Sequence, residues 1–177
     1  MRAAIALLLF LASDLFAQAH PELPERPVWC ETLVRFSPKG GAADLLVAQI
    51  ESADRRIAIA IYGLNNPAIV DALIAAKRRG VEVAVKLDKL QSAGKNQKAQ
   101  IERLKRSGIR AEVSELSRLL HNKFAVIDRR VVITGSYNWT VQAEHRHREN
   151  LVLLVCPSIA EVYEKEWALI ESGRRAG

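Results

Sequence analysis

The stretch that decides the fold is LLHNKFAVIDRRVVITGSYNWT, residues 119–140. Residues 121–127 have the composition of a strand, residues 128–130 are charged and predict a turn, and the apolar run 131–133 predicts a buried returning strand. The sequence Gly-Ser-Tyr-Asn at 135–138 then brings small polar side chains to the end of that strand. We therefore expect a hydrophobic hairpin that carries polar groups at one end.

The polar groups of this hairpin suit one kind of chemistry. His121 and Lys123 are two residues apart, so on a strand they project from the same face. Ser136 and Asn138 add a hydroxyl and an amide at the end of the returning strand. An imidazole can attack phosphorus or carry a proton, and the other three groups can donate to phosphate oxygens. The hairpin therefore predicts a site for a phosphodiester.

The spacing of these residues resembles that of a known family. His121, Lys123 and Asp128 fit the H-x-K-x4-D pattern of the phospholipase D superfamily, and residues 135–138 match the G-S-x-N element that follows it there. The single motif and the short chain most resemble the Nuc-like bacterial endonuclease branch. The mitochondrial cardiolipin hydrolases are similar as well. The resemblance covers essentially the whole chain after residue 19, although its specific motifs occupy a small part of it.

The resemblance implies a set of site residues and their roles. The six candidates are His121, Lys123, Asp128, Ser136, Asn138 and Glu149. His121 is expected to form a covalent phosphohistidine, while Lys123, Asn138 and Ser136 donate to the phosphate. Glu149 stands where the family usually has an acidic partner for the histidine, so it is expected to accept from the second ring nitrogen of His121.

Asp128 is expected to have a different role from the other five candidates. It belongs to the family motif, but it has the opposite strand parity to His121 and should not face the phosphate. We interpret it as a structural residue that binds the turn or a neighbouring backbone group.

One histidine does not complete a covalent mechanism. The nucleophile and the acid that protonates the leaving oxygen need opposite protonation states in the same step. Larger members of the family carry two motifs in one chain, whereas this chain has one, so we expect a homodimer in which a second His121 completes the site.

A rival for the acid is His145 or His147 of the same chain. If residues 144–149 are extended, these two histidines lie on the same face as Glu149, and the three side chains could also bind a transition metal. We prefer the interpretation that this segment is a basic rim of the site that contacts phosphates.

The composition of the chain favours some classes of substrate over others. The formal net charge is +6, which favours nucleic acid or anionic lipid as a partner. Aromatic residues make up 6% of the chain, and no segment looks like a base-reading helix, so little sequence specificity is expected. Tyr137 and Trp139 flank Asn138 and are expected to stack on a base or line the cleft, with the core as an equal alternative for Trp139. The first hypothesis is an endonuclease that cuts DNA, or RNA, without a metal or cofactor. The alternatives are a phospholipase acting on phospholipid or cardiolipin and a non-catalytic nucleic-acid-binding protein.

The N-terminus has the pattern of an export signal. Arg2 precedes an apolar run at 3–11, and Ala-Gln-Ala at 17–19 fits a cleavage site. The run is shorter than the about 20 residues that span a bilayer, although an uncleaved anchor remains an alternative. We expect a signal peptide at 1–19, a single domain at 20–177, a periplasmic or secreted location, and no stable membrane insertion after cleavage.

Two cysteines, Cys30 and Cys156, leave three arrangements open: one disulfide within the chain, two buried thiols, or a bridge between subunits.

Outside the hairpin, helical and strand patterns alternate, which predicts an α/β fold with a mixed sheet flanked by helices on both faces, as the phospholipase D resemblance also implies. The expected strands are 31–36, 56–62, 81–87, 109–113 and 149–155, and the expected helices are 42–52, 67–79, 95–107 and 157–172.

Overall fold

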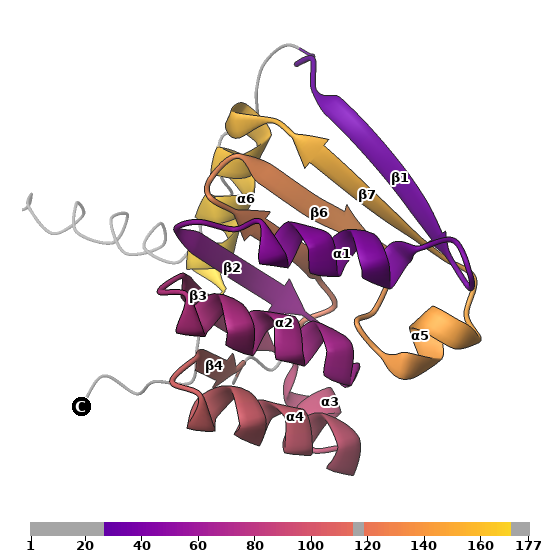
Figure 1. Cartoon of the computed structure of the whole chain (residues 1–177), viewed down its shortest axis with the longest axis vertical. Coiled ribbons are helices and arrows are strands. Elements are labelled where there is room, and N and C mark those ends of the chain that lie inside the picture. The colour runs from indigo at the N-terminus through magenta and orange to yellow at the C-terminus, as the bar shows by residue number, and fades with distance from the viewer. Residues whose placement is uncertain (1–26, 115–118, 171–177) are drawn as a thin grey trace, which may run out of the picture.

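The computed structural model describes residues 27–114 and 119–170. Seven strands form one mixed sheet in the order β1-β7-β6-β5-β2-β3-β4, so the central hairpin β5–β6 lies in the middle of it (Figure 1). The strands are β1 (Glu31–Ser37), β2 (Arg56–Ile61), β3 (Glu82–Leu87), β4 (Arg110–Val113), β5 (Lys123–Ile127), β6 (Val131–Gly135) and β7 (Glu149–Val155). Strands β2, β3 and β4 run parallel to one another, and the other pairs are antiparallel.

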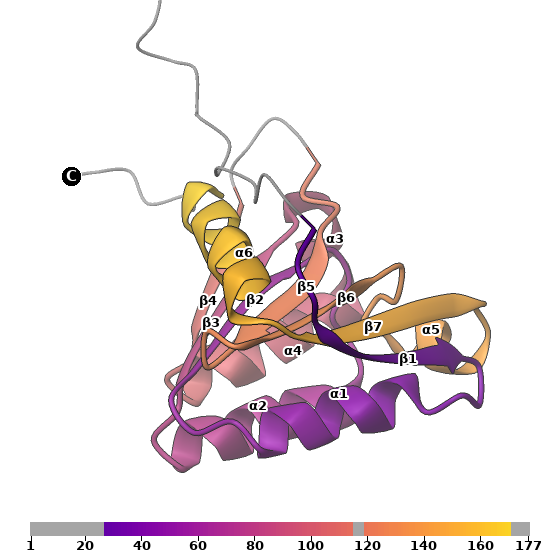
Figure 2. The same ribbon diagram turned by 90° about the horizontal axis from the view of Figure 1, so that it is seen from above.

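Helices cover both faces of the sheet, as predicted. They are α1 (Ala42–Glu51), α2 (Pro67–Arg78), α3 (Lys89–Ser92), α4 (Lys95–Arg106), α5 (Val141–His145) and α6 (Pro157–Leu169). Figure 2 shows α6 on one face and α1 and α2 on the other. The side chain of Asn66 caps α2 by accepting from the Ala68 amide, and Pro67 occupies the first turn, which confirms the predicted start of this helix.

Three local predictions were wrong. The sequence patterns did not predict the short helices α3 and α5, which are only four and five residues long. Because His145 ends α5, residues 144–149 are not extended, and the shared face of His145, His147 and Glu149 does not form. Strand β5 begins at Lys123, so His121 lies in the loop before it rather than on the strand.

The core lies on both sides of the sheet, and β2 contributes to each. Ile57, Ile59 and Ile61 are fully buried on the face covered by α1 and α2, while Ala58 and Ala60 are fully buried on the face covered by α6. This explains the continuous apolar sequence of the strand, since a strand buried on both faces has no polar alternation.

The aromatic residues beside Asn138 also belong to the core. Tyr137 and Trp139 are each 1% exposed, so they do not form a surface for stacking on a base. The alternative in which they line the cleft is therefore wrong.

Helix α6 is attached to the sheet by a buried lysine. Lys86, on β3 next to the edge strand β4, donates from Nζ to the carbonyl oxygens of Trp167 (2.8 Å) and Ile170 at the end of α6. The last carbonyls of a helix lack partners within the helix, so an ammonium group there satisfies them. Burial lowers the pKa of Lys86. Lys86 therefore has a structural role.

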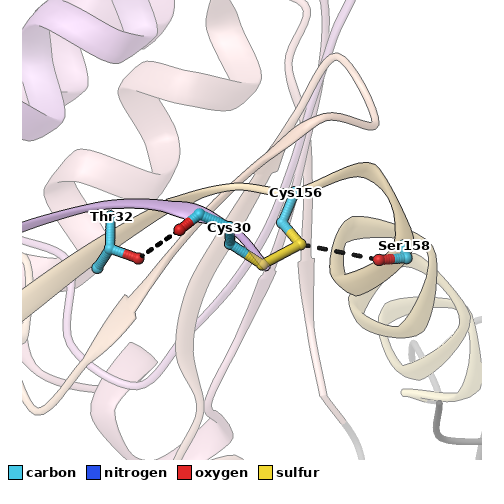
Figure 3. The surroundings of a disulfide bond; sticks show 4 residues. All are labelled: Cys30, Thr32, Cys156 and Ser158. Carbon is cyan, nitrogen blue, oxygen red and sulfur yellow. Dashed lines mark hydrogen bonds between the residues drawn. A yellow bond between two sulfur atoms is a disulfide. The ribbon is translucent and has the colours of Figure 1, made fainter. Parts of the chain in front are cut away.

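A disulfide joins the edge of the sheet to its neighbouring strand (Figure 3). Cys30 precedes β1, Cys156 lies between β7 and α6, and their sulfur atoms are bonded. Strand β1 pairs with β7 along its whole length, from Glu31 opposite Val155 to Ser37 opposite Glu149. Of the three arrangements of the cysteines, the bridge within the chain is the one formed.

Candidate active site

The register of the sheet brings the predicted site residues to one end of it. Antiparallel pairing places the start of β5 beside the end of β6, and the end of β6 beside the start of β7, where Gly135 lies opposite Leu151. The polar residues at these three positions therefore converge. They are His121 and Lys123 before and at the start of β5, Ser136 and Asn138 after β6, and Glu149 at the start of β7.

The side chains of His121 and Lys123 both contact the ring of one tyrosine, Tyr62. Lys123 donates from Nζ to the carbonyl oxygen of His121 at 2.7 Å, and the imidazole meets the Tyr62 ring edge to face, with the ring centroids 4.7 Å apart. The ammonium of Lys123 lies 5.1 Å from the centroid of the same ring. Burial lowers the pKa of Lys123, and the Glu149 carboxylate opposes this effect. The charge of Glu149 is therefore close enough to act on Lys123.

Glu149 contacts other groups than the one predicted. Its Oε2 accepts from the Ser136 hydroxyl, and its Oε1 lies 3.7 Å from Nδ1 of His147. Ser136 Oγ in turn accepts from the Asn150 amide at 3.1 Å. Within residues 27–114 and 119–170, no hydrogen bond joins His121 to Glu149. The imidazole contacts Tyr62, and the carboxylate is engaged by Ser136, so the predicted His121–Glu149 bond is absent from the subunit.

Asn138 lies in the loop after β6 and has an unpaired oxygen. Its Oδ1 is buried and has no hydrogen-bond partner among the described residues. Gly63 makes the close approach possible, because a Cβ at that position would lie 3.3 Å from Oδ1 and 3.0 Å from Cγ2 of Thr140. Unpaired buried polar atoms are rare in cores and require an explanation, and a functional site is one such explanation.

The loop that carries Ser136 and Asn138 is fixed by contacts that sequence reasoning missed. The Trp139 amide donates to the Gly63 carbonyl at 2.9 Å, and the Tyr137 hydroxyl donates to Glu144 Oε2 at 2.7 Å. The same carboxylate accepts from the Ala43 amide in the first turn of α1. Burial, together with the bond to Glu144, raises the pKa of Tyr137, so its hydroxyl remains a donor. Glu144 lies outside every recognised motif, so no sequence signal pointed to this role.

Asp128 is not part of this constellation. It lies in the β5–β6 turn, at the opposite end of β5 from Lys123, and its carboxylate accepts from the backbone amides of Asp54 (2.9 Å), Arg55 (2.8 Å) and Arg56 (2.8 Å). Burial alone would raise the pKa of Asp128, but these three hydrogen bonds lower it below its usual value. The prediction that Asp128 is structural is confirmed, and its inclusion among the catalytic candidates has no support from its position.

Replacing Asp128 with asparagine is expected to destabilise the protein by about 1–3 kcal/mol, because a charged acceptor of three amides becomes neutral. The pKa of Asp128 is depressed in the folded state, so its contribution is present above the unfolded pKa and is lost as the pH falls through the folded pKa. Urea denaturation at pH 7 and at pH 3 measures both effects. Asp54→Asn is the matched control, since it removes the same charge from an exposed neighbour and should change stability by less than about 0.5 kcal/mol. Equal losses in the two variants would contradict this role of Asp128.

The described residues contain no group of three or more His, Cys, Asp or Glu side chains that could hold a metal ion. His145 belongs to α5, whereas His147 pairs with Glu149. The ligand set that the extended segment would have offered is therefore not assembled in the described part of the chain.

A family model described as "Cardiolipin synthase, PLD-like domain" matches residues 46–169, which include every candidate site residue. The chain belongs to the phospholipase D superfamily. Among the superfamily's named proteins, the "Phospholipase D" of Rickettsia typhi is 35% identical over 147 residues, which are 83% of this chain and 69% of the relative. The "Phospholipase D" of Rickettsia prowazekii is 36% identical over 75% of this chain and 63% of the relative. The "Mitochondrial cardiolipin hydrolase" of Xenopus laevis is 34% identical over 69% of this chain and 57% of the relative.

Two solved structures resemble this chain in fold. The crystal structure of Nuc from Salmonella typhimurium, a phospholipase D family member, has a TM-score of 0.78 and 31% identity, covering 83% of this chain and all of that one. NucT from Helicobacter pylori, with a TM-score of 0.71 and 20% identity, covers 80% of this chain and 96% of that one and supports the fold alone. The predicted phospholipase D-like fold is thus confirmed, and the relatives and the Nuc structure together support a phosphodiesterase.

Proposed function

We propose that this member of the superfamily is a metal-independent phosphodiesterase that cuts DNA or RNA with little sequence preference. The observation that carries the proposal is the convergence of His121, Lys123, Ser136 and Glu149 at one end of the sheet. It is supported by the match to Nuc over the whole of that chain and by the net charge of +6. Because the chain spans only 63–69% of the two Rickettsia relatives, their activity is not transferred to it directly.

In the proposed reaction, a ring nitrogen of His121 attacks phosphorus. The P–N bond forms as the P–O bond to the leaving alcohol breaks, and an acid protonates the departing oxygen. Water then attacks the phosphohistidine, the P–N bond breaks, and a base accepts the proton of the water. Lys123 binds a non-bridging oxygen throughout, and Asn138 and Ser136 add donors to the same phosphate.

We propose that the acid is His121 of a second subunit, with both copies facing one phosphate across a two-fold axis. Glu149 is engaged by Ser136 and His147, and one His121 cannot hold both protonation states in one step. Mixing wild-type and His121→Asn subunits tests this arrangement. A shared site makes each mixed dimer inactive, so activity should fall with the square of the wild-type fraction. A linear decrease would show that the subunits act independently.

A specific observation favours a second candidate function. Three exposed apolar side chains lie on segments that carry or contact the site residues. They are Leu90 (73% exposed), next to the Gln91 that binds Tyr62, Leu119 (52%), two residues before His121, and Val141 (42%), three residues after Asn138. Such a rim suits an enzyme that acts at a lipid surface, so a phospholipase acting on phospholipid or cardiolipin is the alternative. The same side chains would also suit the proposed subunit contact.

The substrate is tested with one panel. Single-stranded DNA, duplex DNA, RNA and vesicles of cardiolipin in phosphatidylcholine are incubated with the wild type and with His121→Asn. Cleavage of nucleic acid by the wild type alone supports the nuclease, and release of a lipid product alone assigns the phospholipase. Binding of DNA without cleavage of any substrate would assign the non-catalytic alternative and overturn the enzymatic proposal.

Removing metal ions is expected to leave the activity unchanged within about twofold, because the ammonium of Lys123 supplies at the phosphate the positive charge that a metal ion would otherwise provide. The measurement is the initial rate before and after dialysis against excess EDTA. Loss of activity that is restored by one divalent cation would contradict metal independence.

We also propose that the protein is exported to the periplasm or secreted. The signal peptide predicted at 1–19 and the first residues of the domain at 20–177 lie outside the described residues. A disulfide is typical of proteins outside the cytoplasm, which supports a periplasmic or secreted location. None of the helices in the described ranges has the length and apolar character needed to cross a membrane. Sequencing the mature N-terminus after expression in a bacterial host should give His20 as the first residue.

A further inference from the structure

The Tyr62 ring is the feature that both proposed reacting side chains share. It contacts the His121 imidazole edge to face, with an interplanar angle of 63°, and it lies within cation–π distance of the Lys123 ammonium. His121 itself is exposed and lies in a loop rather than on a strand. Among the contacts of the described residues, the Tyr62 ring is therefore the one that restricts the imidazole.

Tyr62 is held from three directions. Its amide donates to the Asn122 carbonyl at 2.9 Å, which ties it to the loop that carries His121. Its hydroxyl accepts from Gln91 Nε2 on α3 at 2.7 Å. The buried Gln97 of α4 donates to the Tyr62 carbonyl at 3.2 Å and accepts from the Leu64 amide at 2.8 Å. The backbone of Tyr62 is thus held by the loop that carries His121 and by α4, and its ring hydroxyl is held by α3.

We propose that Tyr62 is a positioning residue whose ring holds the His121 imidazole and the Lys123 ammonium in the geometry for attack on phosphorus. The role rests on the proposed function, because it assigns Tyr62 to the same site. An exposed histidine in a loop has several accessible rotamers, and few of them aim a ring nitrogen at a bound phosphate. An edge-to-face contact with a fixed ring selects among these rotamers.

This proposal separates the ring of Tyr62 from its hydroxyl. Tyr62→Phe keeps the ring and loses the bond to Gln91, whereas Tyr62→Leu loses the ring. With a small chromogenic phosphodiester such as bis(4-nitrophenyl) phosphate, we expect Tyr62→Leu to lower kcat by about 10- to 100-fold, because small misplacements of a reacting group have effects of this size. We expect Tyr62→Phe to keep kcat within about threefold of the wild type, because the edge-to-face contact of the aromatic ring, and not the hydroxyl, orients the His121 imidazole.

A second measurement does not depend on activity. The tyrosine ring current shifts the ring-proton resonances of His121 in the NMR spectrum, and the His121→Asn variant identifies these resonances by their absence. The shift should persist in Tyr62→Phe and disappear in Tyr62→Leu. If no substrate is cleaved by any variant, the proposed function fails while this spectrum still tests the contact.

The chain offers a matched control. Tyr163 of α6 makes a similar edge-to-face contact with Phe124 of β5, with centroids 4.9 Å apart, in the core on the face of the sheet that α6 covers. Tyr163→Leu should leave kcat and the His121 resonances unchanged. The proposal is overturned if Tyr62→Leu keeps wild-type kcat, if Tyr62→Phe is as impaired as Tyr62→Leu, or if Tyr163→Leu lowers kcat equally.

Discussion

Replacing His121 with asparagine is expected to lower kcat by at least about 10⁴-fold, because the variant lacks both the nucleophile and the proposed acid. The side chain is exposed and its polar contacts are few, so the fold should be unaffected. The rate is measured with a chromogenic phosphodiester. Quenching the wild type in alkaline denaturant, with a substrate labelled at phosphorus, should trap the label on His121, because the P–N bond of a phosphohistidine survives base but not acid. The variant should retain no label.

His145→Asn is the control for this experiment. It removes another exposed histidine, which ends α5, and it tests one of the two rival acids of the same chain, His145. Activity within about threefold of the wild type is expected, as for surface substitutions away from the chemistry. Two results would falsify the assignment of His121: a variant that still turns over at the wild-type rate, or label trapped at another position.

Reducing the bond between Cys30 and Cys156 is expected to lower the free energy of unfolding by about 4–5 kcal/mol. The two cysteines are 126 residues apart, and a cross-link that closes a loop of this length strongly restricts the unfolded chain. This is a large fraction of the about 5–15 kcal/mol that stabilises a typical domain. Urea denaturation with and without dithiothreitol measures the difference, with the signal followed by circular dichroism.

The control for reduction is the variant Cys30→Ser, which keeps the buried Cys156 sulfur in place. Its stability should equal that of the reduced wild type and should not respond to dithiothreitol. A wild type that loses less than about 1 kcal/mol on reduction would show that strand pairing of β1 with β7 holds the edge without the bridge.

The elements that the sequence predicted correctly are those with strong local signals. Strand β7 begins at Glu149 and ends at Val155 as expected, and α2 begins after the cap Asn66, because a capping side chain followed by proline marks a helix start regardless of its surroundings. The turn at Asp128 was also predicted, and Asp128 and Arg129 both have positive φ there. The short helices α3 and α5 were missed, since four or five residues do not establish a helical period.

The site was predicted as a set of residues but not as a set of contacts. The motif identified His121, Lys123, Ser136 and Glu149, and the structure brings them to one end of the sheet. The partner of each group depends on residues distant in sequence, and this is why the sequence assigned Glu149 to His121 rather than to Ser136. Tyr62 was missed for the same reason: it precedes His121 by 59 residues, and only the antiparallel pairing of β2 with β5 brings the two rings together.

The placement of His121 and Asp128 at opposite ends of β5 divides one short motif into two independent signals. The aspartate binds the hairpin turn to the start of β2, so its presence in a sequence indicates the fold. The histidine and lysine lie at the proposed site, so their presence indicates catalytic activity. A homologous protein that retains the aspartate but has lost the histidine should adopt the same architecture without turnover. One that retains the histidine but has lost the aspartate should be an enzyme that unfolds more readily.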